Sequence, residues 1–220
     1  MKNILLIQSS PSKADSSSNR AARAVLDQVQ SQYPHAEVVT RDVSAEPLPH
    51  AGEALVAGLS APPALRTSEQ SRALARSDAL IDELLAADLL VLAAPMHNFS
   101  IPSTLKAWLD HVVRVGRTFA YSQNGPEGLL KGKRAILVLS RGGVYSAGPA
   151  KPFDFQEPYL RTILGFIGIT EVEVIRVEGT AVGDIGPEKA LTTAVEQVAG
   201  LFSREEAWPV SVSRELAAAV

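Results

Sequence analysis

The run Leu-Leu-Val-Leu-Ala-Ala at residues 89–94 is the feature that most restricts how this chain can fold. Asp88 precedes the run and Pro95 follows it, so it suits a strand that is buried on both faces. Strands of this kind occur in parallel sheets that are covered by helices on either side. Pro95 is expected to end the strand, which places the following side chains at its carboxyl end. Ligands of open α/β sheets bind at that end.

Hydrophobic spacing along the chain predicts four more strands and five amphipathic helices. The strands are expected at residues 4–7, 37–41, 135–139 and 172–177. The helices are expected near residues 18–33, 67–87, 102–116, 160–167 and 191–198. Ser17 or Ser18 is expected to cap the first helix, and Thr67 with Gln70 forms a capping-box pattern at the second. Because strands and helices alternate, we predict a doubly wound parallel sheet with right-handed crossovers and helices on both faces.

Composition limits the function classes. The length of 220 residues suits one domain over residues 1–200, with residues 201–220 as a C-terminal tail and not an independent domain. A net charge of -3 does not indicate the excess of basic residues that nucleic-acid-binding domains carry. The absence of cysteine excludes disulfides, thiolate zinc sites and iron–sulfur clusters. No apolar run is long enough for a membrane span or a signal peptide, so we expect a cytoplasmic protein without a membrane partner.

The turn after the first predicted strand indicates what the sheet does not bind. It contains no glycine, which excludes the dinucleotide fingerprint, and the chain has no correctly spaced P-loop. The turn offers hydroxyls instead, at Ser9, Ser10, Ser12, Ser16, Ser17 and Ser18. With the N–H groups of a helix N-terminus, they could hold a phosphate. From this turn alone, a solvated serine-rich loop with an ordinary helix cap is an equally good interpretation.

Two further strand ends carry residues suited to a flat ligand. Residues 140–143 read Ser-Arg-Gly-Gly, and paired glycines let the backbone approach a ring closely. Residues 95–99 provide an amide, a sulfur and an aromatic ring. Taken singly, the first could be a tight turn and the second a core contact with a capping Asn. Because all three segments fall at one edge of the predicted sheet, we favour a ligand site there.

These segments resemble the FMN-dependent NADH azoreductases, a family that also acts as quinone reductases. The resemblance is carried by residues 10–19, 94–99, 124–129, 140–143 and 164–169. Together they extend from the start of the chain to about residue 200. The resemblance implies a flavodoxin-like fold with parallel strands in the order 2-1-3-4-5. It also implies a homodimer whose pockets are completed by the partner subunit.

The resemblance assigns each segment to a part of the flavin. Ser10, Ser16, Ser17 and Ser18 would hold the phosphate and ribityl end of FMN. Met96, His97, Asn98 and Phe99 would border the isoalloxazine ring. Ser140, Arg141, Gly142 and Gly143 would meet its pyrimidine edge.

The expected substrate pocket departs from the family at two positions. His97 stands where the family often has Tyr, and Ile163 where close relatives have an aromatic residue. We expect Phe119 and Tyr121 to line the pocket with Ile163, and residues 44–66 and 117–133 to shape it. No residue is a certain catalytic group or metal ligand. His97 is a candidate proton donor because an imidazole changes charge near neutral pH, and protonation by solvent is the alternative.

The function implied is that of an oxidoreductase in which NADH reduces FMN, with NADPH as a possible donor. A quinone, azo compound or nitroaromatic would then take two electrons from the same face in a ping-pong order. Cleaving an azo dye to two amines would require two such cycles. The alternative is a flavodoxin-like electron carrier without its own NADH turnover, although such carriers are usually strongly acidic. A phospho-receiver is disfavoured because the strand ends lack metal-binding carboxylates.

Overall fold

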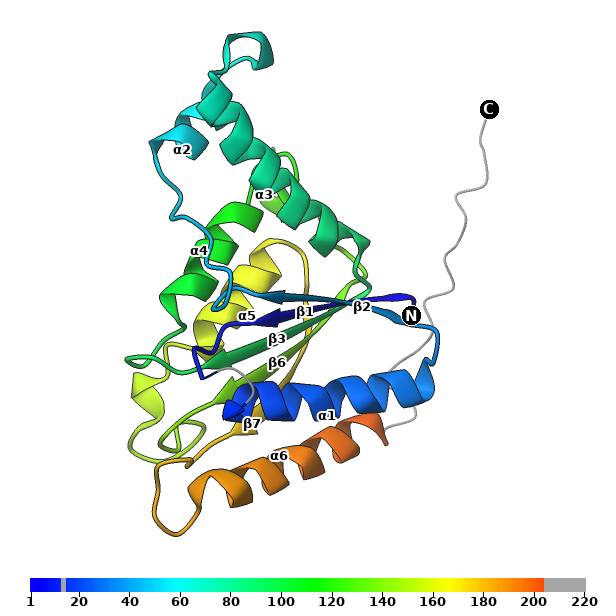
Figure 1. Ribbon diagram of the computed structural model, residues 1–220, viewed down its shortest axis with the longest axis vertical. Helices are drawn as coiled ribbons and strands as arrows, with labels where there is room; N and C mark the ends of the chain where they lie inside the picture. The colour runs from blue at the N-terminus through cyan, green and yellow to red at the C-terminus, as the bar shows by residue number, and fades with distance from the viewer. Residues whose placement is uncertain (13–14, 204–220) are drawn as a thin grey trace.

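Five parallel strands form one central sheet in this computed structural model, which describes residues 1–12 and 15–203. The strands lie in the order β2-β1-β3-β6-β7 (Figure 1). Their bounds are β1 (Asn3–Gln8), β2 (Glu37–Asp42), β3 (Leu89–Pro95), β6 (Arg134–Ser140) and β7 (Glu171–Val177). Counting the parallel strands alone, this is the order 2-1-3-4-5, so the predicted doubly wound sheet is confirmed.

Helices cover both faces of the sheet. On one face lie α1 (Ser17–Gln32) and α6 (Gly186–Phe202), which run side by side in Figure 1. On the other lie α3 (Ser68–Ala86), α4 (Ser103–Val112) and α5 (Glu157–Phe166), and α2 (Glu53–Ser60) packs on α3. The predicted capping box is present at α3, where Thr67 and Gln70 exchange hydrogen bonds with each other's backbone.

The strand at residues 89–94 contributes side chains to both halves of the core. Leu90, Leu92 and Ala94 pack toward α3, α4 and α5. The alternating set Leu89, Val91 and Ala93 packs toward α1 and α6. Each buried leucine of this kind contributes about 1.5–3 kcal/mol to folding. Burial on both faces explains why the segment is a continuous apolar run rather than an alternating one.

Several boundaries differ from the sequence-based expectation. Ser16, not Ser17 or Ser18, is the N-cap of α1. The helix α2 lies inside the proline-containing segment 44–66, for which hydrophobic spacing predicted no helix. Only two α2 residues are buried, Leu55 and Gly58, and a Cβ at Gly58 would lie 3.2 Å from Leu74 on α3. This helix therefore depends on a tertiary contact, which local spacing does not reveal.

The segment 117–133 contains an antiparallel hairpin, β4 (Phe119–Ser122) and β5 (Gly125–Gly128), where hydrophobic spacing predicted no strand. Backbone packs on backbone where the hairpin meets the end of α5. A Cβ at Gly128 would lie only 2.1 Å from the nitrogen of Gly168, and Leu130 N–H donates to the carbonyl of Ile167 at 2.9 Å. Only glycine fits at position 128.

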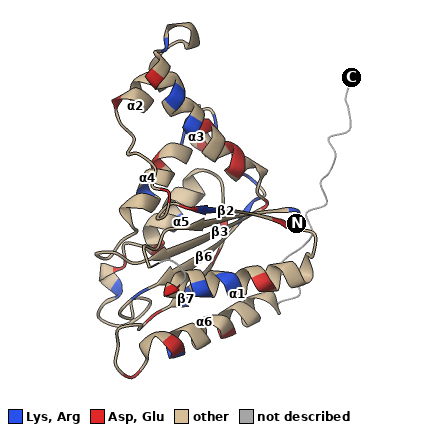
Figure 2. Cartoon of the chain, in the orientation of Figure 1, with Lys and Arg blue, Asp and Glu red and all other residues tan. Residues whose placement is uncertain are grey.

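The C-terminal ends of α4 and α6 also differ from the predicted helix ends. α4 ends at Val112 rather than near Gly116. The arginines that follow, Arg114 and Arg117, both form ion pairs with Asp78 of α3. Figure 2 shows that α3 carries both acidic and basic residues along its length. α6 continues to Phe202, whose side chain is buried, so two residues assigned to the tail belong to the helix.

The predicted tail beyond Ser203, residues 204–220, lies outside the described residues. Within the described ranges, no helix is long and apolar enough to cross a membrane.

Candidate functional site

Three turns meet at the carboxyl edge of the sheet, after β1, β3 and β6. Ser9 N–H donates to the carbonyl of Ala93 at 3.1 Å, which joins the first turn to β3. Met96 N–H donates to the carbonyl of Ser140 at 2.7 Å, which joins the second turn to the third. The three polar segments predicted to meet are therefore neighbours.

The first turn presents hydroxyls and N–H groups at the start of α1. The hydroxyls of Ser16 and Ser18 lie 2.9 Å apart, and Ser10 Oγ accepts a hydrogen bond from Ser12 N–H at 3.3 Å. Within the described part of the chain, the N–H groups of Ser17 and Ser18 donate to no acceptor. Free N–H groups at the positive end of a helix suit a phosphate.

The second turn is held in an uncommon backbone conformation. His97 and Ser100 exchange two backbone hydrogen bonds, of 2.9 and 3.0 Å, across Asn98 and Phe99. Both central residues have positive φ, 47° at Asn98 and 70° at Phe99. Such a conformation costs on the order of 1–3 kcal/mol for a residue that is not glycine. The Phe99 side chain is nevertheless 46% exposed. Strain combined with an exposed ring favours a ligand-binding role for this turn.

The third turn offers backbone N–H groups without acceptors. The carbonyls of Arg141, Gly142 and Gly143 accept hydrogen bonds from the turn after β7. The N–H groups of Gly142 and Gly143 have no acceptor among the described residues. A Cβ at Gly143 would lie 3.1 Å from the ring of Tyr145. Since neither glycine has positive φ, Gly143 serves the close approach of Tyr145 rather than a turn conformation.

The side chain of Arg141 points away from this surface. It is 1% exposed and forms ion pairs with Asp154 and Glu178, both at 2.9 Å. Only the backbone of Arg141 is left for a ligand at the turn. This arrangement was not foreseen from the sequence, because the carboxylates lie far along the chain.

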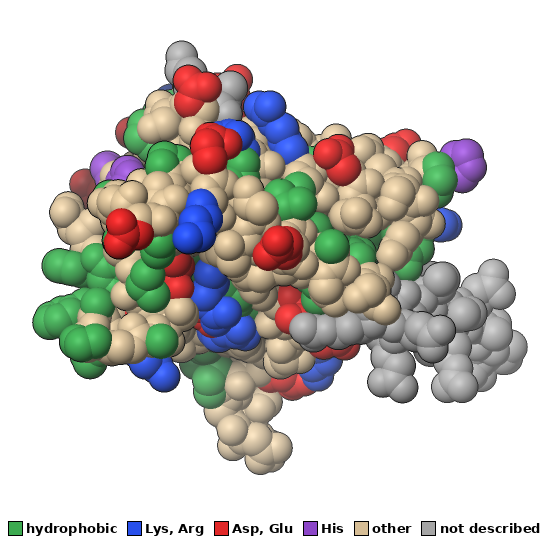
Figure 3. Space-filling model, turned by 90° about the horizontal axis from the view of Figure 1, so that it is seen from below, with side chains coloured by type: hydrophobic (Ala, Val, Ile, Leu, Met, Phe, Trp, Pro, Cys, Tyr) green, Lys and Arg blue, Asp and Glu red, His purple; other side chains and the backbone are tan. Residues whose placement is uncertain are grey.

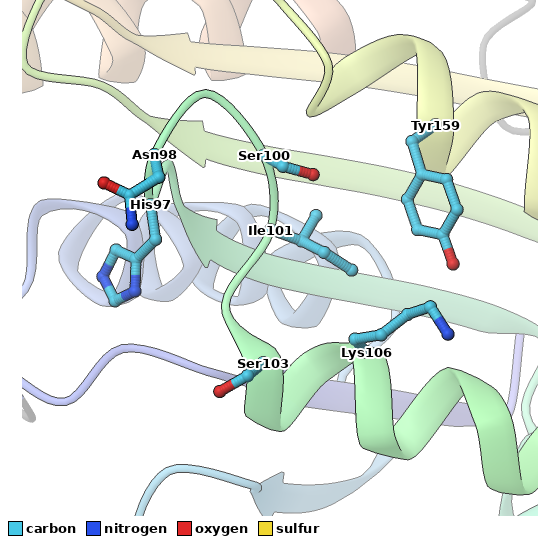
Figure 4. Close-up of a pocket in the computed structure, with 7 residues that line it drawn as sticks. All are labelled: His97, Asn98, Ser100, Ile101, Ser103, Lys106 and Tyr159. Carbon is cyan, nitrogen blue, oxygen red and sulfur yellow. The ribbon is translucent and has the colours of Figure 1, made fainter.

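A cavity of about 470 Å³ opens beside the second turn (Figure 4). Its lining residues are His97, Asn98, Ser100, Ile101, Ser103, Lys106 and Tyr159. Figure 4 shows Lys106 on α4 and Tyr159 on α5 extending toward each other at one end, with His97 and Asn98 at the other. Sequence reasoning missed Lys106 and Tyr159, because each lies on a helix next to a residue of the apolar template. A hydrogen bond with Asp110 raises the pKa of Lys106, and burial raises the pKa of Tyr159.

The residues predicted to line the substrate pocket do not join this cavity. Phe119 packs against Phe166 with ring centroids 4.6 Å apart, at the end of α5 opposite Tyr159. Tyr121 is 72% exposed on the hairpin. Ile163 packs against the core from the middle of α5. The length of α4, about 15 Å for its ten residues, separates the hairpin from the turn of His97.

Exposed apolar side chains surround the third turn. Phe99 contacts Tyr145 edge to face at 6.2 Å and Phe153 at 5.7 Å. Val144 and Phe155 are also exposed in this segment. Figure 3 shows hydrophobic side chains gathered at the left of the molecule, the side where this segment lies in Figure 1. In the described ranges, no group of three His, Asp or Glu residues is arranged to hold a metal ion.

Comparisons with known proteins show which family and which solved structures the chain resembles. A family model described as a flavodoxin-like fold matches residues 2–201. The FMN-dependent NADH:quinone oxidoreductase of Azotobacter vinelandii is 48% identical over 199 residues, covering 90% of this chain and 98% of that protein. A crystal structure of azoreductase from Bacillus anthracis superposes with a TM-score of 0.85 at 30% identity, covering 92% of this chain and 99% of that one. An FMN-dependent NADH-azoreductase from Bacillus anthracis in complex with FMN superposes with a TM-score of 0.84 at 25% identity, covering 93% and 99%.

Proposed function

The chain belongs to the family of proteins with the flavodoxin-like fold, and from this premise we propose that it is an FMN-dependent NADH:quinone oxidoreductase that also reduces azo compounds. The observation that carries the proposal is the meeting of three turns at one sheet edge. The turns of Ser17 and Ser18 and of Gly142 and Gly143 carry N–H groups for which the described residues provide no acceptor. A ligand with a phosphate and a polar ring edge would satisfy them.

The residues at this edge fit FMN. Ser10, Ser16, Ser17 and Ser18 would hold its phosphate and ribityl chain, since a monophosphate needs few positive charges beyond a helix N-terminus. Met96, His97, Asn98 and Phe99 would border the ring. Ser140, Gly142 and Gly143, with the backbone of Arg141, would meet its pyrimidine edge. When bound, FMN supplies the redox chemistry, accepting a hydride from NADH and passing two electrons to an acceptor.

The chain's own groups bind and orient the reactants. The free N–H groups of Gly142 and Gly143 would stabilise negative charge at the ring edge they face. The exposed ring of Phe99 would exclude water from one side of the site. His97, at the rim of the cavity, would donate a proton to the reduced acceptor, with solvent as the alternative source.

We extend the proposal to a ping-pong order, in which NADH leaves before a quinone, azo compound or nitroaromatic enters. Complete cleavage of an azo bond to two amines would need two turnovers. NADPH is a possible donor, and the cytoplasm is the compartment we expect. We expect one domain, residues 1–200, to carry the whole activity. The helix α6 extends two residues beyond this boundary, to Phe202.

The dimer is also a proposal. Phe119 and Tyr121 lie about one helix length from the cavity within their own chain. They can therefore line a substrate pocket only if they reach it from a partner subunit. The exposed ring of Tyr121 on the β4–β5 hairpin is available for such a contact. Sedimentation analysis of the purified protein should give twice the mass of one chain.

Anaerobic absorbance spectroscopy tests the function. The purified protein should bind one FMN per chain, lose its visible absorbance with NADH, and regain it when a quinone is added, without a second enzyme. A protein that binds FMN but is not bleached by NADH or NADPH would be an electron carrier instead. A protein that binds no FMN would contradict the proposal. Initial rates at several concentrations of both substrates should give parallel double-reciprocal lines.

A further inference from the structure

The Arg141 guanidinium is the centre of a buried network that the roles proposed above do not use. Its Nη1 lies 2.9 Å from Oε1 of Glu178. Its Nη2 lies 2.9 Å from Oδ2 of Asp154 and 3.7 Å from Oε2 of Glu157. Its Nε donates to Oε1 of Gln156 at 3.1 Å. Nε and Nη1 donate hydrogen bonds, while Nη2 lies in an ion pair with Asp154 without hydrogen-bond geometry. Partners on these three sides hold the planar guanidinium in one orientation.

One side of the network holds the loop that follows the third turn. The carboxylate of Glu178 accepts hydrogen bonds from the N–H of Tyr145 at 2.8 Å and of Ser146 at 2.9 Å, and also from the Ser146 hydroxyl. Burial of Glu178 opposes its charge, but these bonds and Arg141 outweigh burial and lower its pKa. The ionised carboxylate therefore connects the buried guanidinium to the backbone of Tyr145 and Ser146.

The other side of the network reaches the strand before the second turn. Gln156 is fully buried, and its Nε2 donates to the carbonyl of Ala94 at 3.2 Å. Ala94 stands two residues before Met96. Asp154 accepts hydrogen bonds from the N–H groups of Gln156 and Glu157, at 3.0 and 3.1 Å, and so fixes the segment that carries the amide.

These two sides of the network lead to two aromatic residues at the same edge of the sheet. Tyr145 lies against Gly143, and its ring meets that of Phe99 edge to face with centroids 6.2 Å apart. Phe99 belongs to the turn after β3, and Tyr145 follows the turn after β6. One guanidinium is thus linked through Glu178 to the backbone of Tyr145, and through Gln156 to Ala94 in the strand that leads to Phe99.

We propose that Arg141 is a positioning residue for the flavin, which fixes the Tyr145 wall through Glu178 and the end of β3 through Gln156, and that Tyr145 is a further flavin-contacting residue. The proposal rests on the proposed function for its flavin part. Its positioning part concerns only this chain and can be tested without the cofactor. The Arg141 side chain touches neither the ring nor a substrate in this arrangement.

Amide hydrogen exchange of the protein without cofactor tests the positioning. Glu178→Gln keeps the size of the side chain but removes its charge, so the Tyr145 and Ser146 amides should exchange about tenfold faster. Gln156→Leu should leave those amides unchanged and speed exchange in residues 94–100. Arg141→Lys should affect both segments, since an ammonium cannot serve all four partners. Arg134→Met is the matched control, because Arg134 begins the same strand and pairs with Glu171 at the far end.

FMN titration and visible circular dichroism of the loaded protein test the consequence. Arg141→Lys and Glu178→Gln should raise the Kd for FMN about tenfold and change the flavin dichroism, while Arg134→Met changes neither. Tyr145→Leu should alter the dichroism without affecting exchange in residues 94–100. Thermal unfolding of each variant separates these effects from general loss of stability.

The outcomes are distinct. If wild-type protein binds FMN and the Arg141 and Glu178 variants match it in both exchange and dichroism, the positioning role is overturned. If Tyr145→Leu leaves the dichroism unchanged, the flavin contact is overturned. If wild-type protein binds no FMN, the proposed function fails, and the exchange pattern still decides whether Arg141 orders the two walls.

Discussion

The rings of Phe99 and Tyr145 meet edge to face at 6.2 Å, although the two residues lie 46 positions apart in the chain. The contact joins a strained turn to a glycine-containing turn across the end of the sheet. Both rings lie beside N–H groups that lack acceptors among the described residues. The pair therefore marks where a flat ligand would be enclosed. Substitutions at this position test the site by their effect on flavin binding.

Removal of the Phe99 ring should weaken flavin binding. An aromatic contact of this geometry is worth about 0.5–1.5 kcal/mol beyond its buried area, so Phe99→Ala should raise the Kd for FMN about tenfold. Phe155→Ala is the matched control, because Phe155 is exposed in the adjacent segment and its ring contacts none of the described aromatic rings. Fluorescence titration measures both. Equal losses in the two variants would contradict a specific role for Phe99.

The backbone strain at Phe99 predicts that a glycine variant is more stable than an alanine variant, the reverse of the usual order. Glycine is normally the less stable choice by about 0.5–1 kcal/mol relative to alanine, but it adopts positive φ freely. With φ of 70° at this position, Phe99→Gly should unfold at higher urea concentration than Phe99→Ala. Both variants lack the ring, so the comparison isolates the backbone. An alanine variant as stable as the glycine variant would argue against strain.

The cap of α1 should serve both stability and phosphate binding. Ser16→Ala should lower the free energy of unfolding by about 1 kcal/mol and weaken FMN more than riboflavin, which lacks the phosphate. Thr67→Ala removes the equivalent cap of α3 and should cost similar stability without affecting either flavin. Isothermal titration with both ligands gives the comparison. If Ser16→Ala weakens FMN and riboflavin equally, the phosphate does not bind at this turn.

The lowered pKa of Glu178 predicts that the folded protein loses free energy of unfolding at acid pH. Its pKa is lower in the folded protein than in the unfolded chain, where a glutamate has a pKa of about 4.3. Its ionised form therefore stabilises the protein fully above that value, and this contribution disappears as the pH falls through the folded pKa. Wild-type protein should be more stable than Glu178→Gln at pH 7, and the difference should shrink below about pH 4. Urea unfolding across this range measures it, and a constant difference would exclude titration of Glu178.

Patterns within short sequence windows were sufficient to predict the five strands of the central sheet, five of the helices and the sheet edge at which the site lies. The apolar run at residues 89–94 predicted a doubly buried strand, and the polar segments after three strands predicted where they would meet. Contacts between distant residues were not accessible in this way. Helix α2 forms against Leu74, and the direction of the Arg141 side chain depends on Gln156 and Glu178, which lie 15 and 37 positions away. The pattern of residue types along the chain does not specify which distant residues pair.

The glycine contact between the β4–β5 hairpin and α5 has a mechanical consequence. Gly128 and Gly168 bring two backbones together with no side chain between them, so the hairpin cannot slide over the end of α5. The other end of α5 begins at Glu157, within ion-pair distance of Arg141. α5 therefore connects the buried guanidinium at one end to the hairpin that carries Tyr121 at the other. We expect a shift at the flavin edge to reach the hairpin tip, which in the proposed dimer belongs to the neighbouring pocket.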